Sequence, residues 1–156
     1  MWQDALIDLC SSETDWTFIE KVRYWSERLF NISLISFLFC EKNLLVKYVS
    51  PDSFHEFPIT LGIAGSVVSS QKAIVTLNMR NSPNFDSKVD LNTLMSVLTV
   101  PLSLKNGTCF GILQIPLKDG GKVNIGDEWR ENIEAMAKFF GKIVELGYTY
   151  YKKSIF

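Results

Sequence analysis

The residue types that most often carry chemistry are few in this sequence. It has three cysteines, Cys10, Cys40 and Cys109, and one histidine, His55. The cysteines lie far apart without CxxC spacing, so reduced thiols fit better than a zinc cage or a disulfide framework. The histidine lies in a polar segment, and no nucleophile has a base at triad or dyad spacing. We therefore expect no catalytic residue, no metal site and no cofactor.

One short segment has residue types that suit an anionic ligand. Gly62-Ile-Ala-Gly65 is followed by Ser66 to Gln71, a pattern that predicts a tight glycine turn leading into a short helix. Backbone amides at a helix N-terminus attract phosphate, and small residues beside them let a ligand approach. A phosphate-bearing ligand is chemically plausible there.

Helices are predicted at both ends of the chain. The first 31 residues read as helix broken near Ser11 and Ser12, and Ser12 with Asp15 resembles a capping box. Another helix opens at Gly126, with acidic residues in its first turn, and runs nearly to the end. Apolar residues recur at helical spacing and predict the buried faces: Trp16, Ile19, Val22, Trp25 and Leu29 first, then Trp129, Ile133, Met136, Phe140, Ile143 or Val144, and Tyr151.

Two strands are predicted directly after the N-terminal helices. Residues 32–40 and 44–49 are rich in β-branched and aromatic residues and favour an antiparallel pair. Pro51 and Pro58 are expected to confine residues 50–58 to an irregular connection, because proline removes a donor from a strand ladder.

Three further strands are predicted after the short helix. One covers residues 73–77, and a long loop rich in Asn, Asp, Ser and Pro follows over residues 78–90. The apolar runs 96–102 and 109–117 flank Asn106-Gly107, a strong hairpin signal. These two runs are expected to be adjacent central strands.

Length and composition indicate one domain. The chain has 156 residues, 47% hydrophobic and 13% aromatic, which is enough apolar material for a substantial core. The element order predicts an α+β fold, with an antiparallel sheet covered on one face by terminal helices. We expect a single domain over residues 1–156 with a helical extension at 1–12.

The charge balance and the hydropathy pattern exclude several partner classes. Lys plus Arg total 16 against 17 for Asp plus Glu, so no global field would attract nucleic acid or anionic lipid. No apolar run reaches the roughly 20 residues that span a bilayer, and the N-terminus lacks a signal-peptide pattern. A cytoplasmic location is expected.

Four stretches resemble the GAF family, the small-molecule sensing domains of cyclic-nucleotide phosphodiesterases, phytochromes and bacterial regulators. They are similar to the family's GIAG.V turn, D..P.F...VD loop, S.L..P strand and GVLQ strand. In this sequence they are Gly62-Ile-Ala-Gly65-Ser-Val-Val, Asn78 to Asp90 with Pro83, Phe85 and Val89, Ser96-Val-Leu-Thr-Val-Pro-Leu102, and Phe110-Gly-Ile-Leu-Gln114. The resemblance covers nearly the whole chain and implies a lid of loop and short helix on the second face of the sheet.

The resemblance also implies a ligand pocket between the sheet and the lid. Its expected residues are Ser36, Ile63, Ala64, Asn78, Phe85, Thr93 and Ser96. A cyclic nucleotide is one candidate ligand. Two departures argue against it, since Ser50-Pro51 replaces a Phe-Asp pair of the nucleotide binders and the segment between Asp90 and Ser96 is shorter than theirs.

Two motifs of the family, the reductase cysteines and a salt-bridge motif, are absent or incomplete in this chain. The free methionine sulfoxide reductases of this fold use cysteines in the glycine turn and the long loop, and this chain lacks them there. The phosphodiesterase branch has an Asn-Lys, Phe, Asp-Glu motif, of which Lys118 and Asp127-Glu128 are present while Leu117 and Val123 replace the Asn and the Phe. A structural salt bridge between Lys118 and Asp127 is expected.

The terminal helices suggest how the domain acts. Trp2, Leu6 and Leu9 at one end, and Tyr148, Tyr150 and Tyr151 at the other, either complete the core or form an interface. The first hypothesis is a non-catalytic regulatory module that dimerises or docks through these helices and binds a small ligand. The alternative is a ligand-free interaction domain whose pocket is filled by its own side chains, for which Phe37, Phe39, Phe85 and Met95 are the candidates.

Overall fold

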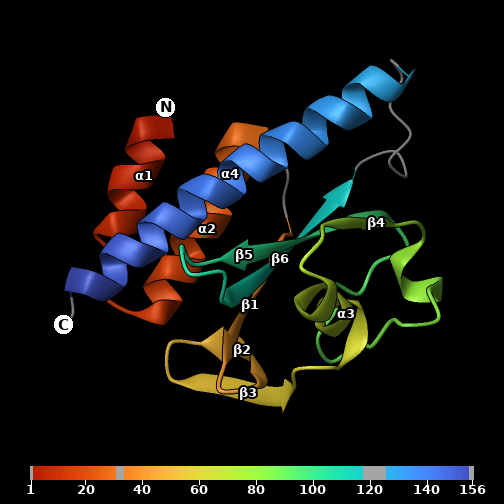
Figure 1. Cartoon of the computed structure of the whole chain (residues 1–156), viewed down its shortest axis with the longest axis horizontal. Coiled ribbons are helices and arrows are strands. Elements are labelled where there is room, and N and C mark those ends of the chain that lie inside the picture. The colour runs from red at the N-terminus through yellow and green to blue at the C-terminus, as the bar shows by residue number, and fades with distance from the viewer. Residues whose placement is uncertain (1, 31–33, 118–125, 155–156) are drawn as a thin grey trace.

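The structure is a computed structural model that describes residues 2–30, 34–117 and 126–154 (Figure 1). Six strands form one antiparallel sheet in the order β3-β2-β1-β6-β5-β4. The helices are α1 (Trp2–Cys10), α2 (Asp15–Phe30), α3 (Gly62–Ser70) and α4 (Gly126–Ser154), with a 3-10 turn η1 (Met79–Asn81). The strands are β1 (Ser36–Glu41), β2 (Leu44–Ser50), β3 (Ser53–Pro58), β4 (Ile74–Thr76), β5 (Ser96–Ser103) and β6 (Cys109–Leu117).

The sheet separates two layers of different composition. The helices α1, α2 and α4 cover one face, and α3 with the segment that includes η1 covers the other (Figure 1). We call these the helix face and the lid face. Successive strand residues alternate between them, so Phe37 and Phe39 of β1 join the helix-face core while Leu38 joins the lid-face core. The predicted α+β architecture with terminal helices on one face is confirmed.

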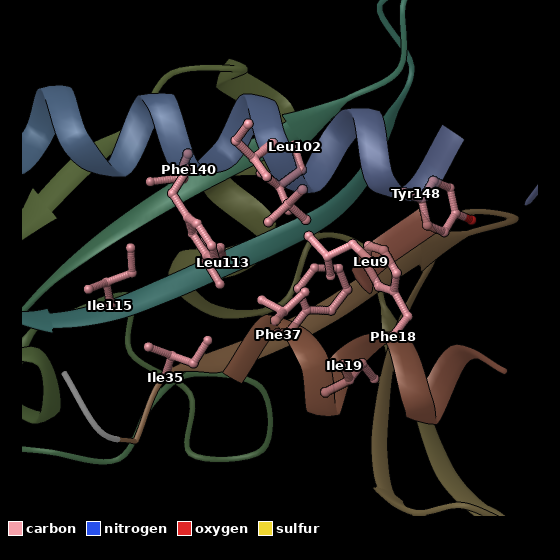
Figure 2. Close-up of a cluster of buried hydrophobic side chains, with 14 of the residues drawn as sticks. Leu9, Phe18, Ile19, Ile35, Phe37, Leu102, Leu113, Ile115, Phe140 and Tyr148 are labelled. Atoms are coloured by element: carbon pink, nitrogen blue, oxygen red, sulfur yellow. The ribbon is translucent and has the colours of Figure 1, made fainter. Parts of the chain in front are cut away.

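The helix-face core contains aliphatic side chains and a group of aromatic rings that includes Phe18 of α2 (Figure 2). The Phe18 ring stacks on Tyr151 at 5.6 Å and meets Phe37 edge-on at 6.0 Å. The Phe110 ring stacks on Tyr148 at 4.1 Å. Buried rings of this kind contribute about 1.5–3 kcal/mol each by desolvation, and favourable ring pairs add about 0.5–1.5 kcal/mol.

Residues 53–58 correct the expectation of an irregular connection. They form β3, an edge strand that pairs antiparallel with β2 from Leu44 opposite Pro58 to Ser50 opposite Ser53. Pro58 is the last residue of the strand and Pro51 precedes it, in the turn after β2. An edge strand tolerates proline because one side of its backbone needs no partner.

The start of α2 corrects a second expectation. Ser12 does not form a capping box with Asp15, because its hydroxyl donates back to the Leu9 carbonyl at 2.8 Å. The Thr14 hydroxyl oxygen instead accepts a hydrogen bond from the Thr17 amide at 3.0 Å, which is the geometry of an N-cap. The break between the first two helices lies where the sequence indicated.

The ends of the terminal helices largely complete the core. Leu9, Tyr148 and Tyr151 are buried, whereas Tyr150 is exposed. Helix α1 packs closely along α4, where Gly147 faces Leu9. Within residues 2–30, 34–117 and 126–154, no helix combines the length and the apolar character needed to cross a membrane.

Candidate functional site

The N-terminus of α3 has a backbone geometry that requires glycine. Gly62 has φ +72°, and a Cβ at this position would lie 2.6 Å from both Asp90 Oδ2 and Val89 Cγ2. The missing side chain lets the loop after η1 approach the first turn of the helix. The predicted glycine turn and short helix are therefore confirmed as local structure.

The carboxylate of Asp90 occupies the position where this helix end would bind an anion. Oδ2 accepts hydrogen bonds from the backbone amides of Ile63 at 2.8 Å and Asp86 at 3.0 Å. Oδ1 accepts from the Ala64 amide at 3.0 Å and from the Gln114 side-chain nitrogen at 3.0 Å. Each oxygen thus has two donors, and the negative charge faces the positive end of the helix dipole.

The Gln114 side chain extends this network to the centre of the sheet. Its Oε1 accepts a hydrogen bond from the Leu91 backbone amide at 2.7 Å. Gln114 is 0% and Asp90 2% exposed, so both polar groups are satisfied by protein partners. This arrangement, which we call the Asp90 plug, fastens the lid loop to α3 and to β6.

The predicted ligand residues on α3 and the long loop lie close together, but their groups already have protein partners. Ile63 is buried in a cluster with Met79 and Val97, against which Phe85 packs. Ala64 is buried among Val67 and the lid-face strand residues. The two amides that suited a phosphate are those that Asp90 accepts from.

The other predicted ligand residues flank η1 or lie on the sheet. The Thr93 carbonyl accepts from the Arg80 amide at 2.9 Å, and Asn78 is exposed with φ 48°. Ser96 is buried at the start of β5. Ser36 lies opposite Gln114 in the register of β1 and β6. Ser36 therefore neighbours the plug, while Asn78 and Thr93 belong to the connection around η1.

The expectation that Phe37 and Phe39 fill the lid pocket is wrong. Both rings point to the helix face, where they lie 4.8 Å apart beside Phe18. Aliphatic side chains fill the lid face instead: Leu38, Leu45, Val67, Val89 and Ile112. Residues 37–40 are all apolar, so the sequence does not say which side chains of β1 face which layer.

A cavity of about 470 Å³ lies beside β4 and β5, on the helix face of the sheet. Its floor is apolar, and it carries two lysines, one after α3 and one on α4. Its lining residues are Gln71, Lys72, Ala73, Val75, Leu98, Val100 and Lys138. None of the seven predicted ligand residues belongs to it, and sequence analysis gave no signal for it.

The predicted salt bridge and the question of a metal site concern residues that the structure describes only in part. Lys118 and the side chain of Asp127 lie outside the described residues, so the salt bridge between them stays a prediction. Among the side chains that the structure does describe, no group of three or more His, Cys, Asp or Glu residues is placed to hold a metal ion.

Sequence analysis missed the role of Asp90 and Gln114 although it quoted both residues. They appeared as parts of the loop and strand motifs, 24 positions apart. Their contact depends on the register that places β6 beneath the lid, and this register is not visible in a local pattern. The only local signal was a buried glutamine in an otherwise apolar strand.

Comparison with protein-family models finds no match to the chain, and comparison with curated proteins finds none either. Solved structures do match. The GAF domain of A. aeolicus nlh2 in an inactive state has a TM-score of 0.68 and 17% identity, covering 95% of this chain and 93% of that one. The GAF domain from Acinetobacter phosphoenolpyruvate-protein phosphotransferase has a TM-score of 0.66 and 11% identity, covering 94% and 89%.

A structural relative of another kind also matches. The free methionine-R-sulfoxide reductase from Neisseria meningitidis, in complex with its substrate, has a TM-score of 0.61 and 17% identity, covering 98% of this chain and 91% of that one. At these identities the likeness establishes the fold and does not separate a regulatory domain from an enzyme. The chain has the GAF fold.

Proposed function

We propose that this chain is a non-catalytic regulatory module that acts by pairing with a second copy through its terminal helices. The observation that carries the proposal is a row of exposed apolar side chains on α4. Phe139, Leu146 and Tyr150 are 50%, 47% and 55% exposed. Their spacing of seven and then four residues places them on one face of the helix, separate from the buried face.

Helix α1 borders this row. Its Trp2 meets the Phe139 ring edge-on at 4.5 Å. The sheet already covers the opposite side of these helices through Phe140 and Val144. A row with heptad-like spacing is complementary to itself, so a second copy related by two-fold symmetry is the occupant that we infer. We call this row the α4 stripe.

The structural relatives support a regulatory role. One is described as a putative GAF sensor protein from Burkholderia vietnamiensis and another as a GAF domain/HD domain protein from Geobacter sulfurreducens. We infer that a signal would change how the terminal helices of two copies pair. The α4 stripe gives this chain a surface on which such a change would act.

The Asp90 plug favours the ligand-free alternative at the lid. An anionic ligand such as a cyclic nucleotide would have to displace a buried carboxylate that accepts four hydrogen bonds. A thermal-shift screen with cGMP, cAMP and a metabolite panel decides this point. A ligand bound only by the folded state raises stability by about 2.7 kcal/mol at a hundredfold excess over Kd, and a shift with either nucleotide would refute a closed site.

We propose the absence of catalysis because the reactive cysteines of the reductases of this fold are replaced in this chain. Ile63, Ala64, Asn84 and Phe85 stand where the resemblance placed the reactive cysteines. The test is reduction of free methionine-R-sulfoxide with dithiothreitol as the electron donor. Turnover above that of the heat-denatured protein would overturn the non-catalytic assignment.

Sedimentation over a range of concentrations tests the pairing. We expect the wild type to be a dimer, and Leu146→Glu to weaken dimerisation at least tenfold because it places a charge in an apolar seam, a factor that corresponds to about 1.4 kcal/mol. Ser69→Glu is the matched control, because Ser69 is exposed on α3 at the lid face. A wild type that stays monomeric at every concentration would contradict the proposal.

A further inference from the structure

Two of the three cysteines are brought together by the fold. Cys40 is the fifth residue of β1, and Cys109 opens β6, which is the neighbouring strand. Cys109 belongs to the buried lid-face cluster, and Cys40 is one of the partly buried side chains packed against that cluster. Both sulfur atoms therefore lie on the same face of the same strand pair.

A β-bulge produces this arrangement. Gly111 pairs with Phe39 of β1 and with Leu102 of β5, but the next pair of β5 and β6 is Ser103 with Cys109, so Phe110 is the extra residue. Its ring turns to the helix face and stacks on Tyr148. The bulge therefore returns Cys109 to the lid face, on the side where β1 continues from Phe39 to Cys40.

The Cys109 thiol donates to the Gly111 carbonyl, with Sγ 3.4 Å from the oxygen. Hydrogen bonding from the neighbouring Cys40 thiol lowers the pKa of Cys109 to about 7, although burial opposes the shift. The pKa of Cys40 is raised, first by the same hydrogen bond and then by burial. The two thiols titrate together. One proton is released close to neutral pH, and the second stays bound at that pH.

We propose that Cys40 and Cys109 form a reversible thiol–disulfide site that responds to hydroperoxides. The Cys109 thiolate attacks the peroxide oxygen, which forms a sulfenic acid and releases hydroxide. The Cys40 thiol then attacks the sulfenic sulfur and gives its proton to the departing hydroxyl, so the disulfide forms and water leaves. The proton that Cys109 released on ionising neutralises the hydroxide from the first step. In sum, two thiols and one hydrogen peroxide give one disulfide and two waters.

The strand geometry suits this bond. The pairing of β1 with β6 ends at Phe39 opposite Gly111, and Cys40 and Cys109 are the next lid-face residues of the two strands. A disulfide between them requires Cα atoms about 4.4–6.8 Å apart. Access is also provided, because Cys40 is partly exposed and adjoins the exposed β1–β2 turn, whereas Cys109 is 9% exposed. A reagent as small as hydrogen peroxide therefore has a route to the pair.

Oxidation of a Cys10→Ser chain tests the proposal, because this background leaves only Cys40 and Cys109 as thiols. The reduced protein is exposed to hydrogen peroxide, and free thiols are counted by maleimide gel shift and intact mass. We expect free thiols to fall from two to none with the loss of two hydrogen atoms, and dithiothreitol to restore both. Peptide mapping should join the two strand segments within one chain.

Single replacements supply the controls. In the Cys10→Ser background, Cys40→Ser and Cys109→Ser should each remove the two-hydrogen loss, and Cys109→Ser should slow the first peroxide reaction at least tenfold. Wild type should map to the same bond with Cys10 still free. A disulfide through Cys10, a bond between two chains, or oxidation of Cys40 and Cys109 only to separate sulfenic or sulfinic acids would overturn the proposal.

Discussion

The Gln114 side-chain nitrogen lies 3.0 Å from Oδ1 of Asp90, and this contact joins the central strand β6 to the lid loop. Through Asp90 the same contact reaches the first turn of α3. One buried carboxylate thus holds three segments that are distant in sequence. The Asp90 carboxylate therefore occupies the helix N-terminus at which an anionic ligand would bind.

Replacement of Asp90 by Asn should destabilise the protein by about 1.5–3 kcal/mol, the usual value for hydrogen bonds to a charged group. Both carboxylate oxygens face two donors. Asparagine must therefore direct its NH2 group at a pair of N–H groups in either orientation of its amide. Urea unfolding followed by near-UV circular dichroism measures the effect.

Asp86→Asn is the matched control for this prediction. The Oδ1 of Asp86 accepts one hydrogen bond, from the Lys88 amide at 2.9 Å, and its side chain is only half-buried. An asparagine oxygen can accept that bond, so we expect a loss under about 0.5 kcal/mol, typical of surface sites. Equal effects of the two substitutions would mean that the plug has no special role.

Gly147→Ala should loosen the contact between α1 and α4. A Cβ at Gly147 would lie 2.6 Å from Leu9 Cβ, which is part of a short, closely packed helix. Overpacking of this kind costs about 1–3 kcal/mol. Thermal unfolding measures this loss of stability.

Gly141→Ala in the same helix is the control. Its added Cβ would lie 3.4 Å from Leu102 Cδ2, so the substitution should be neutral or stabilise the protein by up to about 1 kcal/mol through helix propensity.

Most of the fold followed from local patterns in the sequence. Helical spacing predicted the terminal helices, a glycine turn predicted α3, and apolar or β-branched runs bounded by turn residues predicted five of the six strands described. The missed strand was β3, which lies at the edge of the sheet, and its residues are largely exposed. It carries no buried face to create a pattern, and Pro58 is tolerated there only because the edge has a free side.

The candidate site was less predictable because its contacts are long-range. Ala64 and Asp90 are 26 positions apart, and the residues around either one do not predict their hydrogen bond. The direction of Phe37 into the helix face depends on which layer packs against β1. The contact of Cys40 with Cys109 depends on a bulge at Phe110, and single-sequence patterns do not locate bulges.

The stability of the wild type should fall in alkaline solution through Tyr151. Burial and the hydrogen bond to Asp15, with Tyr151 Oη 2.7 Å from Oδ1, raise its pKa from the ordinary 10.0. A raised pKa contributes stability that is fully present below pH 10.0 and is lost as pH rises through the window above it. Tyr151→Phe removes this contribution.

We therefore expect Tyr151→Phe to be less stable than wild type by about 1.5–3 kcal/mol at neutral pH, the value of one hydrogen bond to a charged group. The difference should narrow above pH 10.0. Urea unfolding of both proteins on each side of that pH measures it. Tyr150→Phe is the control, because Tyr150 is exposed. A difference that is constant with pH would contradict the assignment.

The rate at which peroxide oxidises the Cys10→Ser chain should rise with pH through about 7, the lowered pKa of Cys109. The thiolate is the reactive form, so its fraction sets the rate. The negative charge of Glu145 on α4 opposes the lowering of the Cys109 pKa, and that of Glu41 raises the pKa of Cys40. Cys40→Ser replaces the thiol donor with a hydroxyl donor and should keep the midpoint near 7, whereas Cys40→Ala should raise it. Stopped-flow measurement of peroxide consumption locates both midpoints, and an unchanged midpoint in Cys40→Ala would show that Cys40 does not activate Cys109.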